Sequence, residues 1–192
     1  DVPHTCGISV DDEKAARDIV SHLLAQGCSR IASVSSVTDG IAPWYSQART
    51  RGFTRALQDR CLQPGPDWPV NSFQEAESVA YALATGPAPL PDGIFCFQDV
   101  LAAGFLRGLH RAGVRVPDDL LLAGFDNMDI ASMTTPSITT IAQPFHELGR
   151  EAVRLLISLL RKEIVGDRRV YLAHELLIRE STTRQTKGVS PT

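Results

Sequence analysis

The side chains best suited to chemistry in this sequence gather where predicted strands end. They combine carboxylates, amides, a guanidinium and aromatic rings, and they are Trp44, Tyr45, Arg49, Phe73, Gln98, Asp99, Asp126 and Asn127. Carboxylates, amides and a guanidinium pair with several hydroxyl groups in fixed directions, while aromatic faces cover C–H surfaces. The set therefore predicts a binding site for a polar small molecule, and a sugar or related polyol fits it best.

Patterns typical of catalysis or of metal binding are missing from the sequence. The five histidines never fall in HxxxH or HExxH spacing, and the four cysteines form no CxxC pair. There is also no GxGxxG, GKS, GKT or GxSxG, so a phosphate cradle and a nucleophile elbow are both unsupported. We therefore expect no enzyme activity, no cofactor and no metal. An enzyme on a flavodoxin-like scaffold would need a nucleophile–base pair, and none can be named.

A phosphoryl-accepting receiver domain is the main catalytic alternative, because it is also doubly wound and carries an acidic pair like Asp11-Asp12. Its chemistry requires a lysine at the end of a late strand. The lysines here are Lys14, Lys162 and Lys187, and none is placed in that way. The sequence therefore disfavours a receiver.

One strand–helix–strand unit, Ile94 to Asn127, positions the centre of the polar set. The apolar run over residues 94–97 is too short for a helix and suits a strand buried on both faces. A helical stripe follows and ends at Gly113, and residues 120–125 form a second buried strand. Both strands give way to polar residues at their carboxyl ends, which is the edge where open α/β sheets bind ligands.

The other predicted elements continue the alternation. Helices are expected from Asp11 or Asp12 to Gly27 and over residues 46–60, 74–84 and 145–162. Strands or extended runs are expected over residues 31–34, 70–73, 137–142 and 171–178. This order predicts an α/β fold with a parallel sheet flanked by helices. The apolar stripe of the 145–162 helix is wider than one sheet face needs, so we expect something else to cover part of it.

Charge and composition narrow the partners. The net charge of −3 disfavours direct DNA binding by these residues, because such binding relies on neutralising phosphates. No apolar stretch approaches the roughly 18 residues of a membrane span, and residues 1–12 lack the regions of a signal peptide. The scattered cysteines fit a reduced, cytoplasmic setting. Residues 183–192 contain almost no apolar side chains and are expected to be disordered.

Four separated motifs carry a family resemblance. They are FQDVLAAG, GVRVPDDLLLAGFDN, TTPSITTIAQP with HELGREAVRLL, and LLIRESTTR. In order and spacing they resemble the effector domain of bacterial transcriptional regulators of the lactose-repressor (LacI/GalR) family, from about Val10 to Arg184. The resemblance implies a class I periplasmic-binding-protein-like lobe that binds a small-molecule effector such as a sugar. A secreted sugar-binding transport protein shares this fold and is the alternative.

The resemblance also assigns roles to residues. It implies that Arg49, in an RxxGF motif, Gln98 and Asp126 contact the effector. The alternative for Arg49 is a surface arginine whose stem lies on the core. Phe73 is either a core residue or an aromatic platform for the effector, and the resemblance favours the platform. Asp99 is interpreted first as a cap of the following helix and second as a ligand contact.

The family pattern bears on two further sets of residues. Trp44 and Tyr45 match it less clearly, because the loop before RxxGF varies. A homodimer surface is implied on two neighbouring segments, with Leu106, Arg107 and His110 on one and Ile130 to Thr134 on the other. The alternative for the first segment is a solvated helix face with one exposed leucine.

The resemblance finally divides the chain into four parts. Residues 1–10 would be a crossover remnant of an amino-terminal lobe, and residues 11–142 would be the carboxyl-terminal lobe. Residues 143–182 would be a helix and strand associated with the amino-terminal lobe and the crossover. Residues 183–192 would be a tail. A largely missing second lobe would leave the 145–162 helix to dock on the remaining lobe or against another copy. Operator DNA would be read by a helix-turn-helix that precedes these residues in the family.

Overall fold

A three-stranded parallel sheet lies at the centre of the structure. The computed structural model describes residues 6–38, 40–163 and 169–184. Strands β2 (Ile31–Val34), β3 (Gly93–Cys96) and β4 (Leu121–Ala123) pair in that order, and every residue of the three is buried. Burial on both faces explains why these strands are short, unbroken apolar runs rather than alternating ones.

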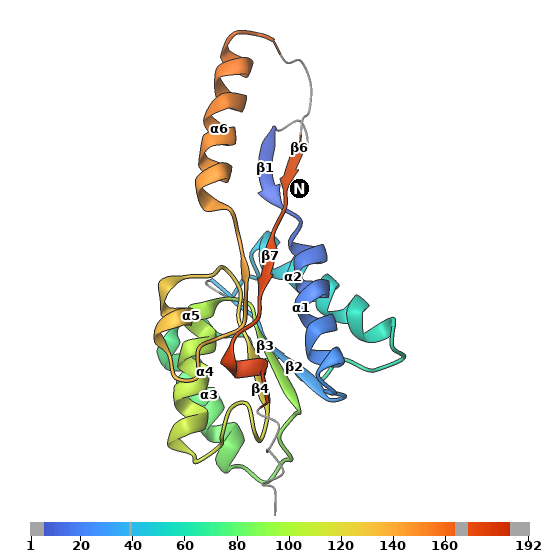
Figure 1. Ribbon diagram of the computed structural model, residues 1–192, viewed down its shortest axis with the longest axis vertical. Coiled ribbons are helices and arrows are strands. Elements are labelled where there is room, and N and C mark those ends of the chain that lie inside the picture. Colours follow the sequence, from blue (N-terminus) through green and yellow to red (C-terminus); the bar gives the residue numbers. More distant parts are fainter. Residues whose placement is uncertain (1–5, 39, 164–168, 185–192) are drawn as a thin grey trace, which may run out of the picture.

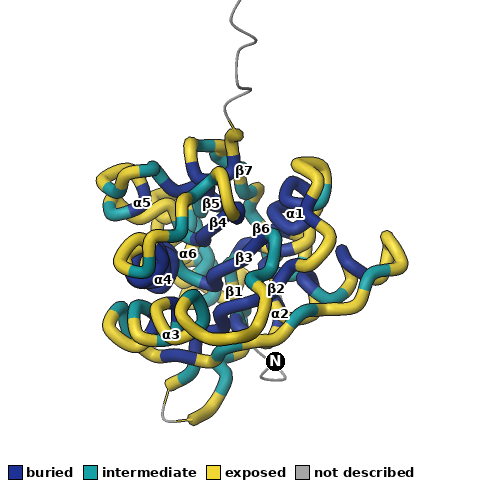
Figure 2. The backbone as a smooth tube through the Cα atoms, turned by 90° about the horizontal axis from the view of Figure 1, so that it is seen from below, coloured by how far each residue is buried: buried dark blue, intermediate teal, exposed yellow. Residues whose placement is uncertain are grey.

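Helices cover both faces of this sheet (Figures 1 and 2). Ile94 and Cys96 face the core shared with α3 (Phe73–Thr85) and α4 (Asp99–Arg111). Phe95 and Phe97 face the core shared with α1 (Asp12–Ala25) and α2 (Trp44–Gln58). Successive side chains of a strand point to opposite faces, so one four-residue run serves two cores.

Glycines let the helices of each pair approach closely. A Cβ at Gly52 of α2 would lie 2.1 Å from the Glu13 carbonyl oxygen of α1. A Cβ at Gly104 of α4 would lie 2.3 Å from the Phe73 carbonyl oxygen of α3. The contact between α1 and α2 holds Arg49 against the start of α1.

The later part of the chain extends the sheet edge and then leaves it. After α5 (Asp129–Met133), the chain reaches β5 (Thr140–Ala142), which pairs antiparallel with β7 (Glu175–Leu177). Beyond β5, α6 (Phe145–Leu160) stands beside a parallel pair formed by β1 (Gly7–Val10) and β6 (Arg169–Leu172), away from the central sheet (Figure 1). The 3-10 turn η1 (Glu180–Thr182) returns to β4.

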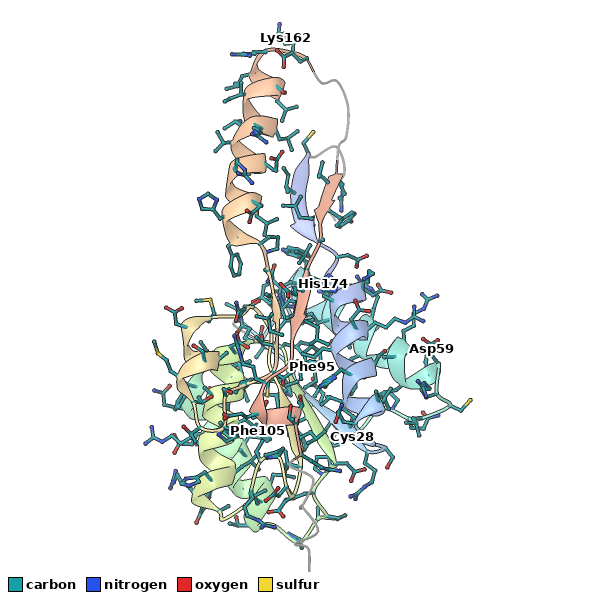
Figure 3. The ribbon with its side chains drawn as sticks, in the orientation of Figure 1. Cys28, Asp59, Phe95, Phe105, Lys162 and His174 are labelled. Carbon is teal, nitrogen blue, oxygen red and sulfur yellow. The ribbon has the colours of Figure 1, made fainter. Side chains whose placement is uncertain are left out.

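The predicted α/β class and its flanking helices are confirmed, but two predicted strands are wrong. Residues 70–73 form no strand; Ser72 caps α3, its Oγ accepting a hydrogen bond from the Glu75 N–H at 3.2 Å. The 171–178 strand is instead β6 and β7, separated at residues 173 and 174 because the chain changes its pairing partner from β1 to β5. His174, labelled in Figure 3, lies at this change and its Nε2 is 2.9 Å from Asp18 Oδ2 of α1.

Of the two arrangements expected for α6, docking onto the remaining lobe is not observed, and burial against another copy stays a prediction. None of its residues is buried, and Val153 and Leu160 are 57% and 74% exposed. The helix contacts β1 rather than the central sheet, and Lys162 marks its far tip in Figure 3. Most of the predicted 183–192 tail and half of the predicted 1–10 segment lie outside the described residues. Among the described residues, no helix has the length and apolar character to cross a membrane.

Candidate ligand-binding site

Arg49 is the centre of the candidate site. It lies on α2, one turn before Gly52, and is only 3% exposed. Its Nε donates to Asp12 Oδ1 at 2.8 Å, one terminal nitrogen donates to the Phe97 carbonyl oxygen, and the other donates to Asp126 Oδ1 at 3.3 Å. Each nitrogen of the guanidinium therefore has an acceptor, which satisfies the requirement for burying a charge.

Aromatic rings cover the guanidinium as well. The Cζ atom of Arg49 lies 3.5 Å from the centroid of the Phe125 ring and 5.1 Å from that of the Tyr45 ring. Rings at these distances attract a cation through their quadrupoles. The arginine is thus fixed in orientation by its hydrogen bonds and by its faces, and the alternative of a solvent-exposed arginine is wrong.

Asp126 reaches Arg49 from the carboxyl end of β4. Its backbone φ is +106°, which is a strained value for a residue with a Cβ, and its N–H donates to the Ile141 carbonyl oxygen at 2.9 Å. Oδ1 also accepts from Gln143 Nε2 at 2.7 Å. Burial raises the pKa of this carboxyl, while Arg49 lowers it in part. Strained backbone conformations of this kind are concentrated at functional sites.

Asp12 supplies a second carboxylate to Arg49. The neighbouring Asp11 caps α1, with Oδ1 accepting from the Lys14 N–H at 2.9 Å, and this leaves Asp12 as the first helical residue, 5% exposed. Burial raises the pKa of Asp12, and the adjacent guanidinium opposes that rise. Two carboxylates therefore share one buried cation.

A cavity of about 250 Å³ opens over this cluster. Its lining residues come from five parts of the chain and are Asp12, Trp44, Tyr45, Arg49, Gln98, Asp126, Gln143 and Phe145. Trp44 also lines a larger cavity of about 500 Å³ beside β1 and β6. The smaller cavity holds the convergent polar groups that orient a bound ligand, so it is the better candidate site.

Five of the seven predicted ligand residues meet in this cavity, and Phe73 and Asp99 do not. Phe73 begins α3 instead of ending a strand, and its ring lies 5.8 Å from the Arg107 Cζ on the outer face of α4. The structure therefore places Phe73 away from the cavity. Asn127 also lies outside it, as a turn residue with φ of +54° whose Oδ1 accepts from Arg179 at 2.7 Å.

Both predicted roles of Asp99 are wrong in this structure. It is fully buried, and its carboxylate accepts from Thr140 Oγ1 at 2.7 Å and from the Met128 N–H at 2.8 Å rather than from α4. Burial raises its pKa to about 7, although both hydrogen bonds lower it. A Cβ at Gly124 would lie 2.2 Å from Oδ1, so only glycine leaves room for the carboxylate. Asp99 thus ties the loop after β4 to β5.

Comparison with known proteins decides the family. The sequence profile of the periplasmic binding protein-like domain matches residues 20–182. The chain is 34% identical over 178 residues to the HTH-type transcriptional repressor CytR of Escherichia coli, covering 91% of this chain and 51% of CytR. The chain belongs to the periplasmic binding protein-like family, as a LacI-type effector-binding domain.

Solved LacI-type structures share the fold. A LacI family regulator from Enterococcus faecium with bound ribose superimposes with a TM-score of 0.82 at 29% identity, over 95% of this chain and 66% of that one. The CelR–cellobiose complex gives a TM-score of 0.84 at 25% identity, over 92% and 54%. The chain spans about half the length of the curated relatives it matches.

Sequence reasoning missed three cavity residues of this LacI-type domain. The sequence indicates Asp12 only as a helix cap or half of an acidic pair, assigns no role to Gln143, and indicates Phe145 only as the start of a helix. A signal for Gln143 was available, because it follows the extended run that ends at Ala142. No local pattern indicated that Phe145, at the base of α6, would line the same cavity.

The residues of the predicted dimer surface do lie together. Leu106, Arg107, His110, Ile130 and Thr134 line one shallow groove of about 230 Å³ between α4 and α5, with Phe73 at its side. Leu106 is only 6% exposed, so it forms the floor of the groove rather than projecting into solvent. The arrangement gives the predicted surface a continuous shape, and its use by a second copy stays a prediction.

Proposed function

We propose that this chain is the effector-sensing domain of a LacI-type transcriptional repressor, and that it binds a sugar or related polyol over Arg49 and Asp126. One observation carries the proposal: a buried Arg49, hydrogen-bonded to the partly exposed Asp126, lies at the floor of an open cavity at the carboxyl ends of β2, β3 and β4. This edge is where open α/β sheets bind ligands.

The cavity offers the groups that a hydroxyl-rich ligand needs. Carboxylate oxygens of Asp126 accept hydrogen bonds from hydroxyls, and the amides of Gln98 and Gln143 both donate and accept. The rings of Trp44 and Tyr45 stand at the same cavity, with centroids 6.0 Å apart at an angle of 83°. Such rings cover the C–H face of a sugar while the polar groups read its hydroxyls.

Relatives support the chemical class and the regulatory role. The Enterococcus faecium regulator binds ribose and CelR binds cellobiose in structures that share this fold. CytR is a helix-turn-helix repressor by name. We therefore propose that the ligand alters lobe closure and operator affinity in a cytoplasmic homodimer, with DNA read by a helix-turn-helix region and no reaction catalysed.

The test is calorimetry of this chain with ribose and with cellobiose, followed in parallel by tryptophan emission. Trp44 lies at the cavity, whereas Trp68 packs on Phe105 at 6.2 Å, so a Trp68→Phe variant reports on the site alone. We expect saturable heat for a neutral saccharide together with a change in Trp44 emission. Saccharides that give neither heat nor an emission change would contradict the proposed function.

A further inference from the structure

The formal charge at the floor of the cavity restricts the class of ligand more than the polarity of the cavity does. Within hydrogen-bonding distance, one guanidinium faces two carboxylates, with Asp12 at 2.8 Å and Asp126 at 3.3 Å. Both partners are shielded from solvent, since the side chains of Asp12 and Asp126 are 4% and 16% exposed. The formal charge of this group of three is negative, although its centre is an arginine.

The arginine also has no open edge for an anion. Carboxylates and phosphates bind arginine through two parallel hydrogen bonds from neighbouring nitrogens. Here Nε is committed to Asp12, one terminal nitrogen to the Phe97 carbonyl and the other to Asp126, while rings cover the faces. A guanidinium has five N–H donors, so two remain that a neutral hydroxyl oxygen can accept singly.

We propose that Asp12 is a specificity-determining residue that makes this site select uncharged polyols and reject phosphorylated or carboxylated sugars. This deepens the proposed function and rests on it for the identity of the site. Asp12 pairs with Arg49 and offsets its positive charge. Arg49 therefore does not offset the negative charge that Asp126 presents to a ligand. A ligand hydroxyl donates to Asp126, whereas a phosphate meets like charge in a site where water screens poorly.

Inorganic sulfate is the probe of this proposal, because its binding can be measured without knowing the effector. Sulfate is titrated into the Trp68→Phe chain at constant ionic strength while Trp44 emission is recorded. We expect no saturable response from this chain. Asp12→Asn keeps an oxygen that accepts from Arg49 Nε and removes one charge, so it should give a saturable response, with an apparent Kd at least about tenfold below the highest sulfate concentration used.

Glu13→Gln is the matched control, because it removes the same charge from the next residue of α1. Glu13 pairs with Arg51 at 3.0 Å on the surface and has no part in the Arg49 cluster. Asp12→Asn binding sulfate no better than Glu13→Gln, or the wild-type cavity binding sulfate saturably, would overturn the proposal. Circular dichroism melting of each variant reports whether the fold is retained, and Asp12→Ser serves if the asparagine variant unfolds.

Paired titrations of ribose and ribose 5-phosphate separate the two proposals. Wild type binding ribose at least about tenfold more tightly than the phosphate supports selection by charge. Equal or tighter binding of the phosphate overturns it. If neither sugar binds, the proposed function loses its support, while the sulfate titration still decides the role of Asp12.

Discussion

Arg49 and Asp126 are 77 residues apart in the chain, and their side chains are joined by a 3.3 Å hydrogen bond beneath an open cavity. The bond connects α2 to the strained turn after β4, so the two elements that frame the site hold one another in place. Because both groups are largely shielded from solvent, we expect the pair to contribute to stability and, under the proposed function, to ligand binding as well.

Asp126→Asn separates these two contributions. The asparagine oxygen can still accept from Gln143 Nε2, so the fold should be retained, but the charged acceptor for a ligand hydroxyl is lost. Losing a hydrogen bond to a charged group costs about 1.5–3 kcal/mol, so the affinity for a saccharide should fall by about 10- to 100-fold in calorimetry.

Asp119→Asn is the control for that change, because Asp119 is an acid of the α4–β4 connection that pairs with Arg115 at 2.7 Å on the surface. It removes the same charge far from the cavity, and its saccharide affinity should equal that of the wild type. Unchanged affinity in Asp126→Asn would mean that the ligand does not contact this carboxylate.

Arg49→Ala tests the stabilising contribution. It leaves two shielded carboxylates and the Phe97 carbonyl without their donor, and removing one partner of a buried ion pair costs on the order of 3–5 kcal/mol. We expect a large fall in the urea midpoint of unfolding. Arg51→Ala, two residues away and 60% exposed in its pair with Glu13, should change the midpoint little. Similar midpoints for the two variants would contradict the buried network.

The central strands and the Arg49–Asp126 pair were easier to predict from the sequence than the residues that surround them. Apolar runs such as residues 94–97 can only be strands in a chain of this kind, and Arg49 and Asp126 followed from recognisable motifs. Asp12 was missed because its partner lies 37 residues away and nothing local requires it. Phe73 was misplaced because a β-like pattern, Val70 to Phe73, concealed the Ser72 and Glu75 signature of a helix start.

Asp99 shows the same limit for a single residue. The sequence placed it at a strand end beside Gln98, which is correct, but the direction of its side chain depends on Thr140, 41 residues later. Adjacent residues at a strand end therefore serve different purposes: Gln98 lines the cavity and Asp99 holds the loop behind it. Side-chain direction at such a position depends on tertiary contacts that spacing does not encode.

Asp99 should make stability depend on pH in the direction opposite to most carboxylates. Its pKa is about 7 in the folded chain and near 3.8 without burial, so between these values the folded state binds the extra proton. Stability contributed by this group therefore falls as pH rises from about 4 to 7. Asp99→Asn keeps both contacts, its oxygen accepting from the Met128 N–H and its amide donating to Thr140 Oγ1.

Urea unfolding of wild type and Asp99→Asn at several pH values between 5 and 8 checks this prediction. The difference between their free energies of unfolding removes the contributions of other titrating groups, because these are common to both proteins. One such group is His22, whose pKa is lowered by burial and whose contribution weakens as pH falls. We expect the asparagine variant to gain relative stability as pH rises from 5 to about 7, and the difference to level off toward pH 8. A difference that does not vary with pH would show that Asp99 titrates normally.

We expect two copies of the chain to associate through the groove between α4 and α5. Leu106 forms its apolar floor, while Arg107 and His110, two exposed residues of α4, stand at its edge. Because two copies would meet on the same surface, replacing both edge residues with glutamate places like charges opposite one another. In sedimentation at tens of micromolar, the wild type should be a dimer and Arg107→Glu with His110→Glu a monomer. Arg60→Glu, at the exposed end of α2, is the control and should remain dimeric. A monomeric wild type, or a double variant that dimerises like the control, would place the contact elsewhere.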